Sequence, residues 1–242
     1  MRYLIKFSYD GTKFKGFQRQ KEYKNVQGTI EKVLSNYFKE DIIIKGSGRT
    51  DAKVHALNQG AHFDISKKIT KKDINSINKL FNEEIKINNI KLVKDDFHAR
   101  YNAIEKTYKY KIYIGKDKNK EGYYYQINYD LDIKKMQDAA KVLIGTHDFQ
   151  NFVSGYRENY ITTIYSIKIR KEKNTIIFTF KGIGFYRYMV RHLVGALIDI
   201  GKSKVEKSIL INMLNYPKID KKLNVAPAEG LYLIDIKYKY WL

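Results

Sequence analysis

The side chains best suited to chemistry lie together in residues 46–56, which read GSGRTDAKVHA. Arg49, Thr50 and Asp51 place a guanidinium, a hydroxyl and a carboxylate within three residues. An aspartate that acts as a nucleophile must stay ionised; burial raises its pKa, and an adjacent guanidinium lowers it again. Burying the two charges is tolerable only when they are paired and hydrogen-bonded. The alternative interpretation is a polar turn with an exposed ion pair, which contributes about 0–1 kcal/mol.

Two predicted strands would hold these residues as a loop. The β-branched run 42–44 predicts a strand over 41–45, and alternation predicts another over 59–65. Apolar residues three and four positions apart predict a helix over 26–39. Loops between rigid elements are where proteins present catalytic side chains, and glycines let a ligand approach the backbone closely.

The rest of the chain predicts strands and helices in both halves. Further strands are expected at 2–9, 88–94, 108–114, 160–171, 175–181 and 231–240, and further helices at 72–82, 133–143, 186–200 and 204–215. This mixture predicts an α+β fold of two lobes, 1–104 and 105–242, with largely antiparallel sheets flanked by helices. The first lobe would carry the Asp51 loop.

The charge of the chain predicts a polyanionic partner. Its 46 Lys and Arg against 26 Asp and Glu give a net charge of +20, which would steer nucleic acid towards it. The alternative is compositional drift in a chain rich in lysine throughout. The 21 tyrosines and 12 phenylalanines add possible base-stacking surfaces.

Other chemistries are excluded or not supported. Cysteine is absent, which excludes disulfides, thiolate metal sites and thiol nucleophiles. The five histidines show no paired ligand spacing, so we expect no metal. No apolar run is long enough to span a membrane, and the N-terminus alternates like a strand, so we expect a cytoplasmic protein without membrane contact.

Several other polar residues have two open interpretations each. Gln18 could touch RNA or nothing, and His98 could serve a site or be an ordinary satisfied histidine. Tyr108 lies on a strand whose lysines and aromatics alternate, which is also the pattern of a half-buried strand. Arg187 and Arg191 lie four residues apart on a predicted helix, where they could bind phosphate, complete a buried site or face solvent.

Seven blocks occur in order along nearly the whole chain and carry a resemblance to a known family. They are YDGTKFKGFQRQ at 9–20, VQGTIE at 26–31, GRTDAKVHALNQGAHF at 48–63, DFHARYNAIEKTYKYKIY at 96–113, GTHDFQNF at 145–152, GFYRYMVRHLVGALIDIG at 184–201 and APAEGLYLIDIKY at 226–238. Together they resemble the TruA family of tRNA pseudouridine synthases.

The resemblance implies the isomerisation of uridine to pseudouridine at positions 38 to 40 of the tRNA anticodon arm. It implies that Asp51 is the conserved aspartate, that Arg49 pairs with it and helps to expel the base, and that Tyr108 is the active-site tyrosine. It also implies two α/β lobes in the pseudouridine synthase fold, joined across a basic active-site cleft, a homodimer, and no metal or organic cofactor. The residues expected to bind substrate are Tyr108, Gln18, Lys53, His55, His98, Arg187 and Arg191.

Lys53 departs from the family, which usually has glycine there. If the backbone has positive φ at this position, the lysine costs of order 1 kcal/mol or more in strain. Its ammonium could equally meet a phosphate. Phe17, in place of the usual tryptophan, is a milder change.

The reaction itself needs no cofactor, because no atom is gained or lost when uracil leaves the ribose through N1 and rejoins through C5. A carboxylate could attack either the sugar or the uracil ring, and the sequence leaves both routes open. A stacked uridine must first be flipped out. Arg49 could fill the vacated space, while Tyr108 could stack on the base or take part in removing the C5 proton.

Two other functions are compatible with parts of the sequence. The chain could be an RNA-binding module without catalysis, which the intact residues 49–51 argue against. A methyltransferase is poorly supported, because residues 182–184 are only a fragment of a glycine-rich loop and lack the strand and helix that such a loop joins.

Overall fold

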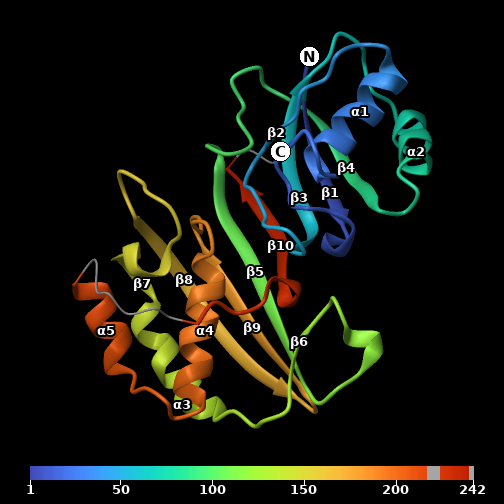
Figure 1. Cartoon of the computed structure of the whole chain (residues 1–242). Helices are drawn as coiled ribbons and strands as arrows, with labels where there is room; N and C mark the ends of the chain where they lie inside the picture. Colours follow the sequence, from blue (N-terminus) through green and yellow to red (C-terminus); the bar gives the residue numbers. More distant parts are fainter. Residues whose placement is uncertain (217–223, 240–242) are drawn as a thin grey trace. The chain divides into compact units, whose positions relative to one another are not determined.

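The computed structural model describes residues 1–216 and 224–239, which form two compact units (Figure 1). Unit 1 comprises Met1–Ile104 and the described residues from Leu233 onwards, and unit 2 comprises the described residues of Glu105–Tyr232. The predicted lobes differ from these units in one respect, since residues from 233 belong with unit 1. The division into lobes 1–104 and 105–242 stays a prediction.

Unit 1 contains a sheet in the strand order β4-β1-β3-β10. These strands are β1 (Arg2–Tyr9), β3 (His55–Asp64), β4 (Ile85–Val93) and β10 (Leu231–Tyr238), and the short β2 (Lys45–Gly46) pairs with β3. β1 pairs antiparallel with both neighbours, and Ile5 lies opposite Ala61 on one side and Ile90 on the other. Its alternation therefore places one row of side chains on the buried face.

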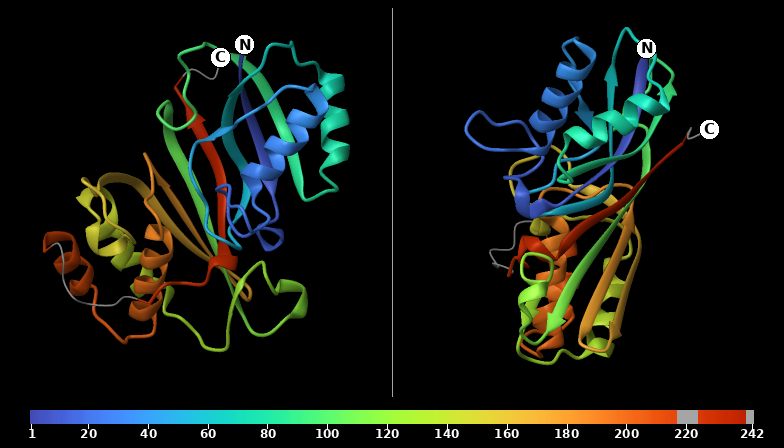
Figure 2. Two further views of the ribbon diagram at one scale, coloured as in Figure 1. Left: turned by 45° about the horizontal axis from the view of Figure 1, so that its top comes forward. Right: turned by 90° about the vertical axis from the view of Figure 1, so that its right-hand side faces the viewer.

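Two helices cover this sheet and lie side by side (Figures 1 and 2). α1 (Val26–Phe38) is capped by Asn25, whose side chain accepts the Gly28 N–H at 2.8 Å. α2 (Lys71–Leu80) begins with a capping box between Thr70 and Asp73. The apolar face of α1 is fully buried at Ile30 and Leu34, which fixes the helix next to the strands around residues 46–56.

Unit 2 contains the strand order β5-β9-β8-β7. These strands are β5 (Ala103–Ile114), β9 (Thr175–Gly182), β8 (Ile161–Glu172) and β7 (Gly145–Asp148), joined antiparallel, while β6 (Tyr125–Ile127) pairs with β5 in parallel. The helices are α3 (Ile133–Ala140), α4 (Met189–Gly201) and α5 (Ser208–Asn215). Short 3-10 helices occur at Gly11–Lys13, Lys118–Lys120, Lys141–Leu143, Gln150–Phe152 and Ala228–Gly230.

Helix α4 forms the centre of unit 2. It is buried along almost its whole length and packs against α3. Gly195 in its middle permits a close approach, since a Cβ there would lie 1.8 Å from the carbonyl oxygen of Asn224. Arg191 on the same helix donates from Nε to the carbonyl oxygen of Ala226 at 2.7 Å. The segment after residue 223 is thus tied to α4 by backbone contact.

The predicted α+β fold is confirmed, with local corrections to several elements. The strand expected over 41–45 is wrong, because only Lys45 and Gly46 pair in the sheet. The N–H groups of Ile42 and Ile44 instead donate to Ser35 Oγ at 2.9 Å and Glu31 Oε1 at 3.1 Å, so α1 side chains satisfy them. The helix expected over 186–200 begins only at Met189.

Tyr188 explains that later helix start, since its φ of 63° lies outside the right-handed helical region. The helix expected over 204–215 likewise begins at Ser208, and the last strand ends at Tyr238. Position 240 of that predicted strand lies outside the described residues. In the described part of the chain, no helix is long and apolar enough to cross a membrane.

Candidate active site

The loop between β2 and β3 ends in a β-turn that carries Asp51 at its first position. The N–H of Val54 donates to the carbonyl oxygen of Asp51 at 3.2 Å, which closes the turn. Lys53, at the third position, has φ of 66°. Turns with positive φ at that position favour glycine. The lysine therefore occupies a strained backbone site, as the comparison with the family glycine anticipated.

A distant segment supports this loop through direct backbone contact. Phe17 donates its N–H to the carbonyl oxygen of Thr50 at 3.0 Å. Gly16, at φ of 100°, lies so close that a Cβ would be 3.2 Å from that oxygen and 3.6 Å from the carbonyl carbon of Asp51. A Cβ at Gly11 would lie 2.4 Å from the carbonyl oxygen of Val54. These two glycines permit the close packing that fixes the backbone around Asp51.

Buried side chains from the sheet hold the loop on its other side. The hydroxyls of Tyr9 and Thr50 share a hydrogen bond of 2.7 Å, and Gln59 Nε2 donates to the carbonyl oxygen of Gly48 at 3.2 Å. Burial raises the pKa of Tyr9 to about 12, against the opposing effect of its hydrogen bonds. The phenol therefore stays protonated at neutral pH and keeps its hydrogen bond to Thr50, next to Asp51.

His55 is buried at the start of β3 and contacts the segment after β1. Its Nδ1 accepts the N–H of Gly11 at 3.1 Å, so this nitrogen carries a lone pair. Asp10 Oδ1 lies 3.4 Å from the same nitrogen, a distance that would form an ion pair only with a protonated ring. The Gly11 contact favours the neutral ring, and His55 thereby helps to position the turn that packs under the loop. Its predicted role in substrate binding stays a prediction.

The polar side chains around the loop differ in exposure. Asp51 is half-buried, whereas Arg49, Lys53 and Gln18 are exposed. The ion pair expected between Arg49 and Asp51 stays a prediction. The roles expected for Arg49 and Gln18 stay predictions. The loop thus presents a carboxylate next to exposed side chains, two of them cationic.

His98 lies near the end of β3 that is opposite to the turn at residues 51–54. Its ring packs 4.6 Å from that of His62, which is seven residues beyond His55 and hence about 23 Å along the strand. The Nδ1 of His98 accepts the N–H of Arg100 at 3.1 Å. Burial, and then the nearby Lys45 and Arg2 cations, lower its pKa. The geometry fits a satisfied histidine, and its predicted substrate contact stays a prediction.

The remaining predicted site residues belong to unit 2, whereas the Asp51 loop belongs to unit 1. Tyr108 is buried on β5, with its ring edge-on to Phe185 at 5.3 Å. Arg187 precedes α4 and lies outside it, and Arg191 lies on its first turn. Their guanidiniums lie 5.1 Å and 4.7 Å from the ring of Tyr188. The side chain of Arg191 is therefore held by two contacts, one with the ring of Tyr188 and one with the carbonyl oxygen of Ala226.

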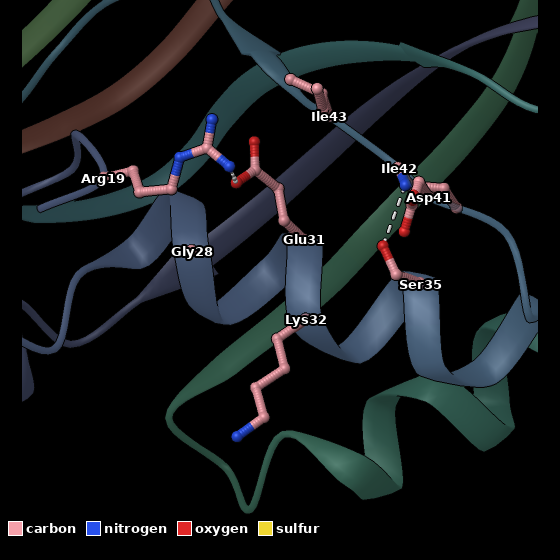
Figure 3. A pocket seen from close by; sticks show the side chains of 8 residues that line it. All are labelled: Arg19, Gly28, Glu31, Lys32, Ser35, Asp41, Ile42 and Ile43. Atoms are coloured by element: carbon pink, nitrogen blue, oxygen red, sulfur yellow. Dashed lines mark hydrogen bonds and ion pairs between the residues drawn. The ribbon is translucent and has the colours of Figure 1, made fainter. Parts of the chain in front are cut away.

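A hollow of about 390 Å³ lies beside α1 and is lined by side chains from the segments before and after the helix as well as from α1 itself (Figure 3). Buried Glu31 accepts from Gln27 Nε2 at 3.0 Å as well as from the N–H of Ile44, and Arg19 Nη1 lies 3.1 Å from its second oxygen. These contacts join the segments before and after α1 to the helix. In the described residues, no group of three or more acidic or histidine side chains could hold a metal ion.

The Asp51 loop combines features that suit one kind of chemistry. A half-buried carboxylate sits on a rigid turn, with exposed cations beside it, in a chain with a net charge of +20. Such an arrangement suits nucleophilic catalysis on a polyanion. The supporting residues Tyr9, Gly16 and Gln59 were not expected in the site, although the glycines of the block at 9–20 were a signal of close packing.

Comparisons with known proteins give the particular family. The tRNA pseudouridine synthase family matches residues 5–102 and 139–239. The tRNA pseudouridine synthase A of Limosilactobacillus reuteri (strain DSM 20016) is 40% identical over 250 residues, covering 98% of this chain and 96% of the relative. Those of Lactobacillus helveticus (strain DPC 4571) and Streptococcus agalactiae serotype III (strain NEM316) are each 39% identical over 246 residues, covering 98% of this chain and 94% and 95% of the relatives.

The chain belongs to the tRNA pseudouridine synthase family and is an isomerase that acts on tRNA. The resemblance seen in the seven sequence blocks is thereby confirmed. A solved structure, "Crystal Structure of a Cbf5-Nop10-Gar1 Complex", matches with a TM-score of 0.36 and 10% identity over 79% of this chain and 46% of that chain. A likeness that distant adds nothing to the assignment.

Proposed function

We propose that Asp51 is the nucleophile that isomerises uridine to pseudouridine at positions 38 to 40 of the tRNA anticodon stem-loop. The observation that carries this proposal is the turn at residues 51–54. It holds a half-buried carboxylate in place through the backbone of Gly16, Phe17 and Thr50. A nucleophile fixed in this way needs no rearrangement before it attacks.

The chemistry follows from that placement. The target uridine is flipped out of its stack so that Asp51 can reach it. The carboxylate attacks C1′ of the ribose or C6 of the uracil, and the bond from N1 to C1′ breaks. The base turns and rejoins C1′ through C5, and the bond to Asp51 breaks again, which frees the carboxylate. The C5 proton then leaves and N1 gains one, so atoms balance without a cofactor. Tyr108 stacks on the base or accepts this proton directly or through water.

The exposed side chains beside Asp51 would bind and open the RNA. Arg49 is exposed and enters the space that the flipped uridine leaves, which helps to expel the base. Lys53 and Gln18 contact the neighbouring RNA backbone, and Arg187 and Arg191 contribute further phosphate contacts. A homodimer that binds tRNA, and its cytoplasmic location, belong to the same proposal.

Replacing the carboxylate tests the proposal directly. Asp51→Asn keeps the size of the side chain and removes its nucleophilicity, so we expect tritium release from tRNA labelled at uridine C5 to be lost. tRNA affinity should persist. Asp41→Asn, at an exposed aspartate outside the loop, is the matched control. Wild-type activity in Asp51→Asn would contradict the assignment of the nucleophile.

A binding protein without catalysis is the second candidate, and the strained Lys53 is the observation that favours it. A lysine at positive φ within the catalytic turn could displace Asp51 from a productive position. The two functions are separated by incubating wild-type protein with unmodified tRNA and mapping pseudouridine by chemical labelling. Tight binding with no pseudouridine formed would select the binding protein.

A further inference from the structure

Unit 2 exposes an aromatic and arginine surface that the proposed chemistry does not use. It consists of residues 153–160, between the 3-10 helix Gln150–Phe152 and β8, together with Tyr186; we call it the 153–160 surface. Tyr156 at its tip is 91% exposed, the highest value among the exposed large hydrophobic residues that the structure describes. An aromatic ring left this open in the unbound protein is a ready stacking platform.

The 153–160 surface is held in shape by hydrogen bonds. The N–H of Arg157 donates to the hydroxyl of Tyr160 at 2.8 Å, and that hydroxyl donates to the carbonyl oxygen of Gly155 at 3.3 Å. The hydroxyl of Tyr186 donates to the carbonyl oxygen of Ile161 at 2.7 Å. The loop is therefore preorganised, which lowers the entropy lost when a ligand binds to it.

The 153–160 surface carries the exposed carboxylate of Glu158 and the guanidinium of Arg157, which is held in a fixed orientation. The guanidinium of Arg157 lies 4.6 Å from the centre of the Tyr186 ring, a cation–π contact that orients its donors while leaving the side chain partly exposed. The ring of Tyr160 packs edge-on against the ring of Tyr186, with 6.4 Å between the ring centres, and so helps to hold Tyr186 in place. A planar guanidinium with exposed donors suits the two oxygens of a phosphate.

An exposed ring beside an oriented guanidinium matches the two repeating parts of a single-stranded nucleic acid. Bases stack on aromatic side chains, and phosphates meet cations along the backbone. A stem-loop offers unstacked bases, whereas a continuous duplex keeps its bases inside. The net charge of +20 favours such a partner over a protein surface of mixed charge.

We propose that the 153–160 surface is a second RNA contact, in which Tyr156 stacks on an unpaired base and Arg157 binds the adjacent phosphate. This inference rests on the proposed action on a tRNA stem-loop and names a part of the recognition that lies outside the Asp51 loop. It assigns the two residues to affinity and placement of the RNA, separate from the chemical step.

The experiment measures the dissociation constant of tRNA for single variants over a range of salt concentrations. Tyr156→Ala should weaken binding about 5- to 20-fold, and Tyr156→Phe should keep most of the affinity because the ring remains. Arg157→Ala should weaken binding and lower the salt slope by about one, whereas Arg157→Lys should restore the slope more fully than the affinity. A stem-loop RNA should compete better than a blunt duplex.

Matched controls come from the same unit. Tyr216 is 64% exposed just after α5, and Arg170 is exposed on β8, so Tyr216→Ala and Arg170→Ala remove an equivalent ring and an equivalent charge elsewhere. Both should bind tRNA like the wild type. Equal affinity of Tyr156→Ala and Tyr216→Ala would overturn the proposal, as would an equal effect of Arg157→Ala and Arg170→Ala.

Two further outcomes separate this inference from others. Sedimentation of Tyr156→Ala should match the wild type; a loss of dimers with unchanged RNA affinity per chain would make the surface a contact between copies and overturn the proposal. Pseudouridine formation by the wild type tests the proposed function separately. If Tyr156→Ala forms pseudouridine at the normal rate and with an unchanged KM, only the second contact is refuted. If the wild-type protein forms no pseudouridine, only the proposed chemistry is refuted.

Discussion

Replacing Lys53 by glycine should separate two effects of this residue, because stability and RNA binding should change in opposite directions. At φ of 66°, a side chain costs about 1–2 kcal/mol through the clash of Cβ with the next carbonyl. Glycine removes that clash, but its greater conformational entropy stabilises the unfolded chain by about 0.4–1 kcal/mol. We therefore expect Lys53→Gly to raise the free energy of unfolding by about 0.5 kcal/mol.

The same change should weaken RNA binding, because it removes an exposed cation two residues from Asp51. One lost phosphate contact lowers the slope of log affinity against log salt by about 0.7–0.9. Lys53→Ala removes the charge and keeps the Cβ, so it should show the binding loss without the gain in stability. Urea denaturation and tRNA titration from 50 to about 300 mM salt measure the two effects independently.

Two other lysines provide the controls. Lys39 has φ of 58° at the C-terminus of α1, and Lys173 has φ of 52° between β8 and β9. Both are exposed, so Lys39→Gly and Lys173→Gly relieve the same strain and remove the same charge. They should gain stability like Lys53→Gly but keep the wild-type salt slope. The reasoning fails if all three variants lose RNA affinity equally, or if Lys53→Gly is less stable than Lys53→Ala.

Two further predictions concern the folding of each unit. Gly195→Ala should lower the free energy of unfolding by about 1–3 kcal/mol because its Cβ would collide with the backbone of Asn224, whereas Gly184→Ala, with open space around it, should change it by less than about 0.5 kcal/mol in the same urea titration. Burial, followed by the effects of His98 and nearby cations, lowers the pKa of His62 to about 4. As the pH falls below 6.5, the His62 imidazole therefore becomes protonated in the unfolded chain before it does so in the folded protein. Stability should fall by about 1–2 kcal/mol between pH 7.5 and 5, and His62→Asn, which keeps an acceptor for the N–H of Ala99, should lose that part of the dependence. An unchanged pH profile in His62→Asn would show that other groups cause it.

Periodicity predicted most of the elements because burial dominates their energetics. Helix α1 was expected over 26–39 and spans Val26–Phe38, and the antiparallel pair expected over 160–171 and 175–181 is formed by β8 and β9. In each case the spacing of apolar residues reports directly which face is buried. This spacing depends only on residues close in sequence, so it predicts the buried face of an element wherever the fold provides a hydrophobic core.

The elements that were mispredicted depend on distant partners. Residues 42–44 are β-branched and suggest a strand, yet Ser35 and Glu31 of α1 take the N–H groups that a neighbouring strand would have taken. The start of α4 depends on the positive φ of Tyr188, whose ring contacts the guanidiniums of Arg187 and Arg191. Side-chain acceptors and backbone strain of this kind leave no periodic pattern in the sequence.

The Asp51 loop shows the same division between local and distant information. Its residue types and its place before β3 could be predicted from residues 46–56 alone. Its conformation could not, because the contacts that fix it come from Tyr9, Gly16 and Phe17, more than 30 residues earlier in the chain. A strained residue persists only where the surroundings over-determine its backbone. Those contacts are what allow a lysine at position 53.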